Sequence, residues 1–128
     1  ALNKPADWGA RVTLTAIELT GATSDIFCKV EALDGTYPVN KETPENISNS
    51  LSQSLSKYQK LSAGVVPHGY TSAAVVEFTC NVEGKSMRCR QYLIPRRNRA
   101  YRVSCWAPSA DFPGLQPVFD DIFNKLKF

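Results

Sequence analysis

Apolar and polar residues alternate along residues 72–106, which predicts three consecutive β-strands. Side chains of a strand point alternately to its two faces, so every second residue shares a side. One side of the first strand is apolar, with Val76, Phe78, Cys80 and Val82. Gly84 and the polar run at 96–99 supply two turns. The pattern therefore predicts an antiparallel meander of three strands.

The segments before the meander predict two strands and a helix. Residues 11–19 and 25–33 alternate in the same way, after a lead-in over 1–10 and with a turn at 21–24 between them. Thr43-Pro44-Glu45 is a typical helix opening, with a hydroxyl cap, a proline and an early acid. We expect a helix over 44–60 whose apolar face carries Ile47, Leu51, Leu55 and Tyr58. Residues 64–69 predict a short irregular strand or loop.

The C-terminal segment, residues 112–126, has the clearest helical pattern. Its apolar residues recur at helical spacing, namely Leu115, Val118, Phe119, Ile122, Phe123 and Leu126. Burying these six side chains contributes very roughly 9–18 kcal/mol before opposing terms, so we expect this helix to cover the sheet. Pro117 limits where the helix can start. The order of elements predicts an α+β fold, an antiparallel β-sheet flanked by helices, in a single domain over 1–128.

The four cysteines also follow the strand pattern. A two-residue Gly84-Lys85 loop would place Cys80 opposite Cys89, and a three-residue loop after Pro95 would set Cys105 beside Cys89. Cys28 lies on the apolar side of its own strand. We therefore expect the four sulfurs on one buried face of the sheet.

Two states of these cysteines stay open. Cys28, Cys80, Cys89 and Cys105 are all disulfide candidates, and the sequence does not select a pairing. They equally suit small buried thiols. A metal site is not expected, because the chain has no CxxC spacing and a single histidine. Cysteine usage favours an oxidising compartment, periplasmic or otherwise extracytoplasmic.

Composition excludes few functions. The chain of 128 residues has a net charge of +3 and a pI near 8.7, which is less basic than is usual for a nucleic-acid-binding domain. No apolar run approaches the roughly 18 residues that cross a bilayer, so we expect no membrane span. Because the sequence begins at Ala1, we expect a processed chain, with room upstream for a removed signal peptide or a lipid anchor.

Arginines and one histidine are the candidate binding residues. The candidates for contact with a partner are Arg96, Arg97, Arg99, Arg102 and His68. Alternation places Arg88, Arg90 and Arg102 away from the cysteines, on the side of Tyr92 and Trp106. Such a stripe suits an acidic protein better than nucleic acid or anionic lipid. Alternatively, the aromatic rings pack under a helix and the arginines extend to its edge.

No set of residues meets the needs of catalysis. A nucleophile, a base and an orienting group do not come together in the sequence, and we expect no enzyme, no cofactor and no metal. Asp120 and Asp121 are adjacent on a helix and diverge by about 100°, so they are not a catalytic pair.

The order of the predicted elements, together with a set of residues near both ends of the sequence, resembles a known family over most of the chain. The residues that carry this likeness are the stretch at 101–112, the helix Val118-Phe119-Asp120-Asp121-Ile122-Phe123, the tail Lys125-Leu126-Lys127-Phe128 and the opening Pro5-Ala6-Asp7-Trp8. They resemble the DcrB-like family of the PsbP-like α/β/α sandwich superfamily. The resemblance implies that fold and a role in binding rather than catalysis.

The resemblance implies two kinds of partner. The first is another protein in the bacterial envelope, and an immunity protein that neutralises a secreted toxin is one concrete form. The alternative is a chaperone that loads effectors of type VI secretion in the cytoplasm. The four cysteines depart from the family pattern and favour the first interpretation.

Overall fold

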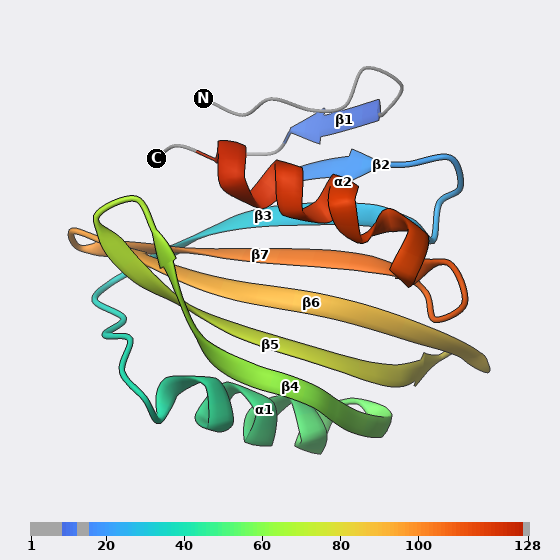
Figure 1. Ribbon diagram of the computed structural model, residues 1–128, viewed down its shortest axis with the longest axis horizontal. Helices are drawn as coiled ribbons and strands as arrows, with labels where there is room; N and C mark the ends of the chain where they lie inside the picture. Colours follow the sequence, from blue (N-terminus) through green and yellow to red (C-terminus); the bar gives the residue numbers. More distant parts are fainter. Residues whose placement is uncertain (1–8, 13–15, 127–128) are drawn as a thin grey trace.

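Seven antiparallel β-strands form one sheet with a helix packed on each face (Figure 1). The computed structural model describes residues 9–12 and 16–126. The strand order is β1-β2-β3-β7-β6-β5-β4, so β1 and β4 are the outer strands. The elements are β1 (Gly9–Val12), β2 (Ala16–Thr20), β3 (Phe27–Asp34), α1 (Thr43–Ser54), β4 (Ser56–His68), β5 (Thr71–Val82), β6 (Lys85–Arg96), β7 (Arg99–Pro108) and α2 (Phe112–Lys125). The predicted α+β class is confirmed.

The N-terminal part of the sheet is a hairpin rather than one strand. β1 and β2 pair antiparallel, with Gly9 opposite Thr20, so the single strand predicted over 11–19 is wrong. Residues 13–15 lie outside the described part of the chain. The same holds for most of the lead-in predicted over 1–10, for the motif at 5–8 and for the last two residues of the tail.

The first helix is shorter than predicted. It begins at Thr43 with Pro44 and Glu45 in its first turn, but the capping residue is Glu42, without a side-chain hydrogen bond. The helix ends at Ser54, and β4 follows as a 13-residue strand that includes most of the predicted loop at 64–69. The apolar stripe continues across this boundary, because Leu55 and Tyr58 join the same cluster as Ile47 and Leu51.

Each helix covers its own apolar cluster. The cluster under α1 consists of Val76, Phe78, Cys80 and Cys89, with Ile47, Leu51, Leu55, Tyr58, Ala63 and Trp106 packed against it. The cluster under α2 is larger and includes Leu19, Cys28, Val30, Tyr92, Ile94, Val103, Cys105, Phe112, Phe119, Ile122 and Phe123. Alternation along β6 explains the division, since Cys89 faces α1 and Tyr92 faces α2.

The cysteines do not share a face, so that prediction is wrong. The loop between β5 and β6 is Glu83-Gly84, and Cys80 lies opposite Met87 rather than Cys89. The loop between β6 and β7 is two residues long, because Arg96 pairs with Arg99. This odd shift turns Cys105 to the opposite face, where it meets Cys28.

Helix α2 covers the sheet, as its pattern predicted. Phe112, Phe119, Ile122 and Phe123 are buried against the strands. Pro117 lies inside the helix and lacks the N–H that would bond to the carbonyl of Pro113. Burial of the apolar face offsets this loss. Neither helix in the described part of the chain has the length and apolar character to span a bilayer.

Candidate functional site

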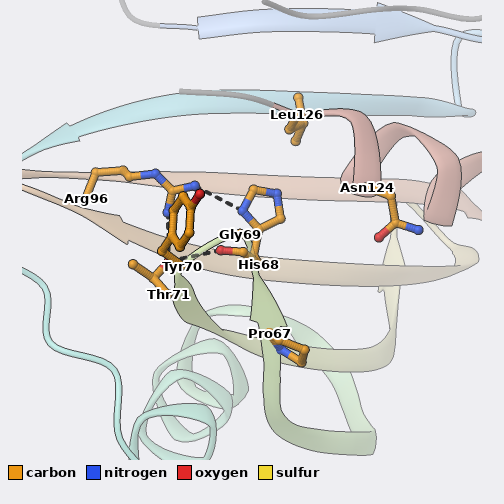
Figure 2. Close-up of a pocket in the computed structure, with 8 residues that line it drawn as sticks. All are labelled: Pro67, His68, Gly69, Tyr70, Thr71, Arg96, Asn124 and Leu126. Carbon is orange, nitrogen blue, oxygen red and sulfur yellow. Dashed lines mark hydrogen bonds between the residues drawn. The ribbon is translucent and has the colours of Figure 1, made fainter.

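The candidate site is a pocket at one end of the sheet, between the β4–β5 turn and the end of α2 (Figure 2). Its volume is about 460 Å³, and it is lined by Pro67, His68, Gly69, Tyr70, Thr71, Arg96, Asn124 and Leu126. β5 and β6 are antiparallel, so the start of β5 and the end of β6 meet at this end. Two of the predicted binding residues, His68 and Arg96, therefore come together from distant parts of the sequence.

His68 is buried, and both of its ring nitrogens have partners. The Arg96 guanidinium lies 3.1 Å from Nδ1, and the carbonyl oxygen of Phe123 lies 3.2 Å from Nε2. A guanidinium only donates, so Nδ1 is the acceptor and Nε2–H donates to the carbonyl. The imidazole also packs on the Phe123 ring, with 4.7 Å between centroids. His68 thus fixes Arg96 and joins β4 to α2.

Burial of the imidazole lowers the pKa of His68 below its ordinary value. The hydrogen bond with the Phe123 carbonyl opposes this shift, and the positive charge of Arg96 adds to it. The ring is therefore neutral at pH 7. Arg96 supplies the only formal charge among the residues that line the pocket.

Arg96 is held in place by neighbouring oxygens as well. Its guanidinium donates to the hydroxyl of Thr71 at 2.8 Å and to the carbonyl of Pro95 at 2.9 Å. Together with the bond to His68, these bonds fix the plane of the charged guanidinium group.

Tyr70 is the most exposed large hydrophobic side chain in the described part of the chain, at 108% of its reference area. It occupies the second position of the two-residue loop between His68 and Thr71. Gly69 has a φ of +60° at the first position, as a type II′ turn requires. The local sequence thus places an aromatic ring at the tip of a hairpin, beside the pocket.

Arg97 and Arg99 extend the positive charge from the pocket to the β6–β7 turn. Both side chains are exposed, and this turn lies at the same end of the sheet as Tyr70 (Figure 1). Asp34 is the acid that lies opposite Arg99 in the ladder. We call the group of Tyr70, Arg96, Arg97 and Arg99 the basic end.

The other arginines lie elsewhere. Arg102 is on the α1 face and binds Glu31 at 3.1 Å, so the structure does not bring it to the pocket. The predicted stripe is therefore wrong for Arg102, and also for Trp106, which lies on the α1 face. Arg88 and Arg90 do share a side with Tyr92, and this side is covered by α2.

Under α2 the arginines form a charge network. Arg88 and Arg90 both bind the buried carboxylate of Glu77, and Arg90 also binds Asp120 on α2. The guanidinium of Arg88 lies over the Phe112 ring, 4.7 Å from its centroid. The alternative in which arginines reach the edge of a covering helix is therefore confirmed for this pair.

A second cavity, of about 400 Å³, continues from the pocket along α2. It shares Pro67 and Asn124 with the pocket and reaches Arg90 and Asp120. Within residues 9–12 and 16–126, no group of three or more His, Cys, Asp or Glu side chains is arranged to hold a metal ion.

Sequence reasoning missed several residues of the site. Tyr70 had a signal, because a Gly-Tyr pair between two strand patterns places the aromatic ring at a turn. Thr71, Asn124 and Leu126 had none, since their position depends on how the end of α2 packs against β4 and β5.

Comparison with known proteins identifies the fold. No protein-family model and no curated protein matches the sequence. Protein PA94 of Pseudomonas aeruginosa, of unknown function, is similar in structure with a TM-score of 0.69 and 14% identity, over 95% of this chain and 84% of that one. The cyanobacterial PsbP of Synechocystis sp. PCC 6803 gives a TM-score of 0.68 with 11% identity, over 94% of this chain and 81% of that one.

A third similar structure is LpqN of Mycobacterium tuberculosis, which is involved in cell envelope biogenesis. Its TM-score is 0.63 with 16% identity, over 98% of this chain and 80% of that one. The fold is PsbP-like. At these identities the likeness extends to the fold and no further.

Proposed function

We propose that this protein is a non-enzymatic, extracytoplasmic binding domain of the DcrB-like family, and that its basic end contacts an acidic surface of another protein. The observation that carries this proposal is the fully exposed Tyr70 at the same end of the sheet as three arginines, of which Arg96 lines the pocket with it. Tyrosine and arginine are the residue types that most often dominate protein interfaces. Charges around such an anchor accelerate association and select the partner.

The geometry suits a preformed surface. Arg96 is fixed by His68 and Thr71, so little side-chain freedom remains to be lost when a carboxylate binds. Arg97 and Arg99, which are exposed, would steer an acidic partner from a distance. His68 has both ring nitrogens engaged and serves this arrangement as a support rather than as a base.

The extracytoplasmic location draws on one relative and on the cysteines. LpqN, which shares the fold, is involved in cell envelope biogenesis. The four cysteines suit an oxidising space. An immunity protein that neutralises a secreted toxin is one concrete form of this function, because such a task needs a stable domain with a charged rim and no chemistry.

A photo-cross-linking amino acid at position 70 tests the proposal in cells of the native host. We expect one dominant adduct with a single protein, and we expect the charge-reversing variant R97E/R99E to lose most of it. The matched control carries the cross-linker at Val82, an exposed position at the β5–β6 turn on the opposite end of the sheet. Equal adducts from positions 70 and 82, or an adduct that charge reversal leaves unchanged, contradict the proposal.

The second candidate function is an effector-loading chaperone that shields an apolar helix. The observation in its favour is a cleft of about 330 Å³ beside α1, lined partly by Leu33, Tyr37, Ile47, Leu51 and Leu93. A chaperone of this kind must bind apolar peptides in the cleft beside α1. Replacing Leu93 by Asp would then abolish binding of an apolar helical peptide, whereas R97E/R99E would leave that binding unchanged.

A further inference from the structure

Cys28 and Cys105 face each other across the junction of β3 and β7. They are direct partners in a ladder that runs without irregularity from Phe27–Trp106 to Asp34–Arg99. Their Sγ atoms are 2.7 Å apart. This distance is below the roughly 3.5–4.0 Å at which non-bonded heavy atoms normally rest, so nothing separates the two sulfurs.

The backbone places this pair at the position where a disulfide fits. Gly35 N–H donates to the carbonyl of Asn98 at 3.3 Å, directly beyond the end of the ladder. Hydrogen-bonded and non-hydrogen-bonded pairs alternate along an antiparallel ladder, and Cys28 lies an odd number of residues from Gly35. The cysteines therefore form a non-hydrogen-bonded pair, with Cα atoms about 4.5 Å apart, within the roughly 4.4–6.8 Å that disulfides span.

The other two cysteines lack this geometry. Cys89 lies opposite Phe78, and Cys80 lies opposite Met87, so the two cysteines are diagonal neighbours on the α1 face. Diagonal neighbours in a sheet are about 7–8 Å apart, beyond the usual span of a disulfide. The sheet itself also separates them from Cys28 and Cys105, which lie in the cluster under α2.

We propose that Cys28 and Cys105 form a structural disulfide in the mature protein, while Cys80 and Cys89 remain thiols. In this reaction both thiols lose a proton and the S–S bond forms. The two electrons reduce the disulfide of a thiol–disulfide oxidoreductase to a dithiol.

The bond has to form before α2 docks. Both cysteines have no exposed surface in the folded protein, and exchange requires a thiolate that the oxidant can reach. Burial also raises the pKa of Cys28, so the reactive thiolate is scarce once the core has closed. The disulfide therefore forms during folding, before the core closes. Once formed, it is buried and out of reach of reductants.

Peptide mapping tests the assignment. The protein is secreted into a bacterial periplasm or refolded in a glutathione redox buffer, then denatured and labelled with N-ethylmaleimide without reductant. We expect two labelled cysteines, at positions 80 and 89, and one cross-linked pair of tryptic peptides spanning 12–29 and 103–125. Four labelled cysteines, or any linkage that includes Cys80 or Cys89, would overturn the proposal.

A matched pair of double variants tests the effect on stability. In the wild type and in C80A/C89A, we expect protein refolded with reductant to unfold roughly 10 °C below the oxidised form. In C28A/C105A, if it folds, the reductant should have no effect. If the oxidised wild type and the wild type refolded with reductant unfold at the same temperature, the bond has no structural role. This result would not affect the cross-linking test of the basic end, which is independent of it.

Discussion

The imidazole of His68 lies 3.2 Å from the carbonyl oxygen of Phe123, so the outer strand β4 is tied to helix α2 at the mouth of the pocket. The ring lies between this carbonyl and the guanidinium of Arg96. The protonation state of one side chain therefore affects both the packing of α2 and the orientation of a charge at the basic end.

This arrangement predicts that stability decreases in mild acid. The pKa of His68 is lowered in the folded state, chiefly by burial, so the unfolded chain takes up a proton first as the pH falls. The stabilisation is fully present above the unfolded pKa of about 6.5 and is lost as the pH falls through the folded pKa. Urea titrations between pH 7.5 and 5 should show a slope of at most about 1.4 kcal/mol per pH unit from this group.

The matched variant for this prediction is His68→Gln. Glutamine keeps a donor for the Phe123 carbonyl and does not titrate. Its unfolding free energy should change less between pH 7 and 5 than that of the wild type. An unchanged slope in the variant would assign the pH dependence to other groups.

The charge network under α2 predicts a large cost for one substitution. Glu77 is 8% exposed and is the shared partner of Arg88 and Arg90. Glu77→Gln leaves the partly buried Arg88 without its carboxylate partner and Arg90 with Asp120 alone, so we expect a loss of about 3–5 kcal/mol in urea unfolding. The exposed pair of Glu45 and Lys60 is the control, and Glu45→Gln should cost about 1 kcal/mol or less. Similar effects of the two substitutions would contradict this account.

Two glycines, Gly84 in the β5–β6 turn and Gly114 in α2, predict opposite effects when each is replaced by alanine. Gly84 has a φ of +81°, and no atom lies within 4 Å of the position that a Cβ would take. Gly84→Ala should therefore cost roughly 1–2 kcal/mol through its backbone alone. Gly114→Ala, also in open space but in the first turn of α2, should instead stabilise by up to about 0.5–1 kcal/mol through helix propensity. Thermal unfolding of the two variants tests both signs.

Truncating a large side chain at the centre of the cluster under α2 should lower the stability of the fold. Phe119 has no exposed surface and packs 5.2 Å from Phe112 between ring centroids. We expect Phe119→Ala to lower the unfolding free energy by about 3–5 kcal/mol. Asp121→Ala, which removes an exposed pair with Lys125 on the same helix, should cost less than about 0.5 kcal/mol. A small effect at Phe119 would show that α2 contributes little to the core.

The helices and strands were predictable from the sequence where apolar residues recur at regular spacing and turn-forming residues mark both ends of the segment. The apolar spacing of 112–126 and the alternation of the meander both appear in the structure as α2 and as β5–β7. The predicted helix was too long because Leu55 and Tyr58 keep a helical spacing, although Leu55 is the extended C-cap residue of α1 and Tyr58 lies in β4; both pack on the same cluster. The spacing of apolar residues shows which side chains are buried, but not whether the backbone is helical or extended. Here the helix α1 and the start of β4 pack side chains on the same cluster.

The cysteine arrangement was not predictable because it depends on loop lengths. Gly84 suits either position of a two-residue turn, and the choice decides whether Cys80 opposes Cys89 or Met87. Asn98, with a φ of +57°, closes a two-residue loop where the run of arginines gave no fixed boundary. One residue of difference moved Cys105 to the other side of the sheet.

Pairing of β3 with β7 joins segments that lie far apart in the chain, since Cys28 and Cys105 are separated by 77 positions. Strands β1 to β3 have no neighbour in the sheet other than one another until β7 has been synthesised. Strand β3 therefore gains its second neighbour in the sheet only when β7, the last strand in the chain, is available. Such long-range pairing slows folding.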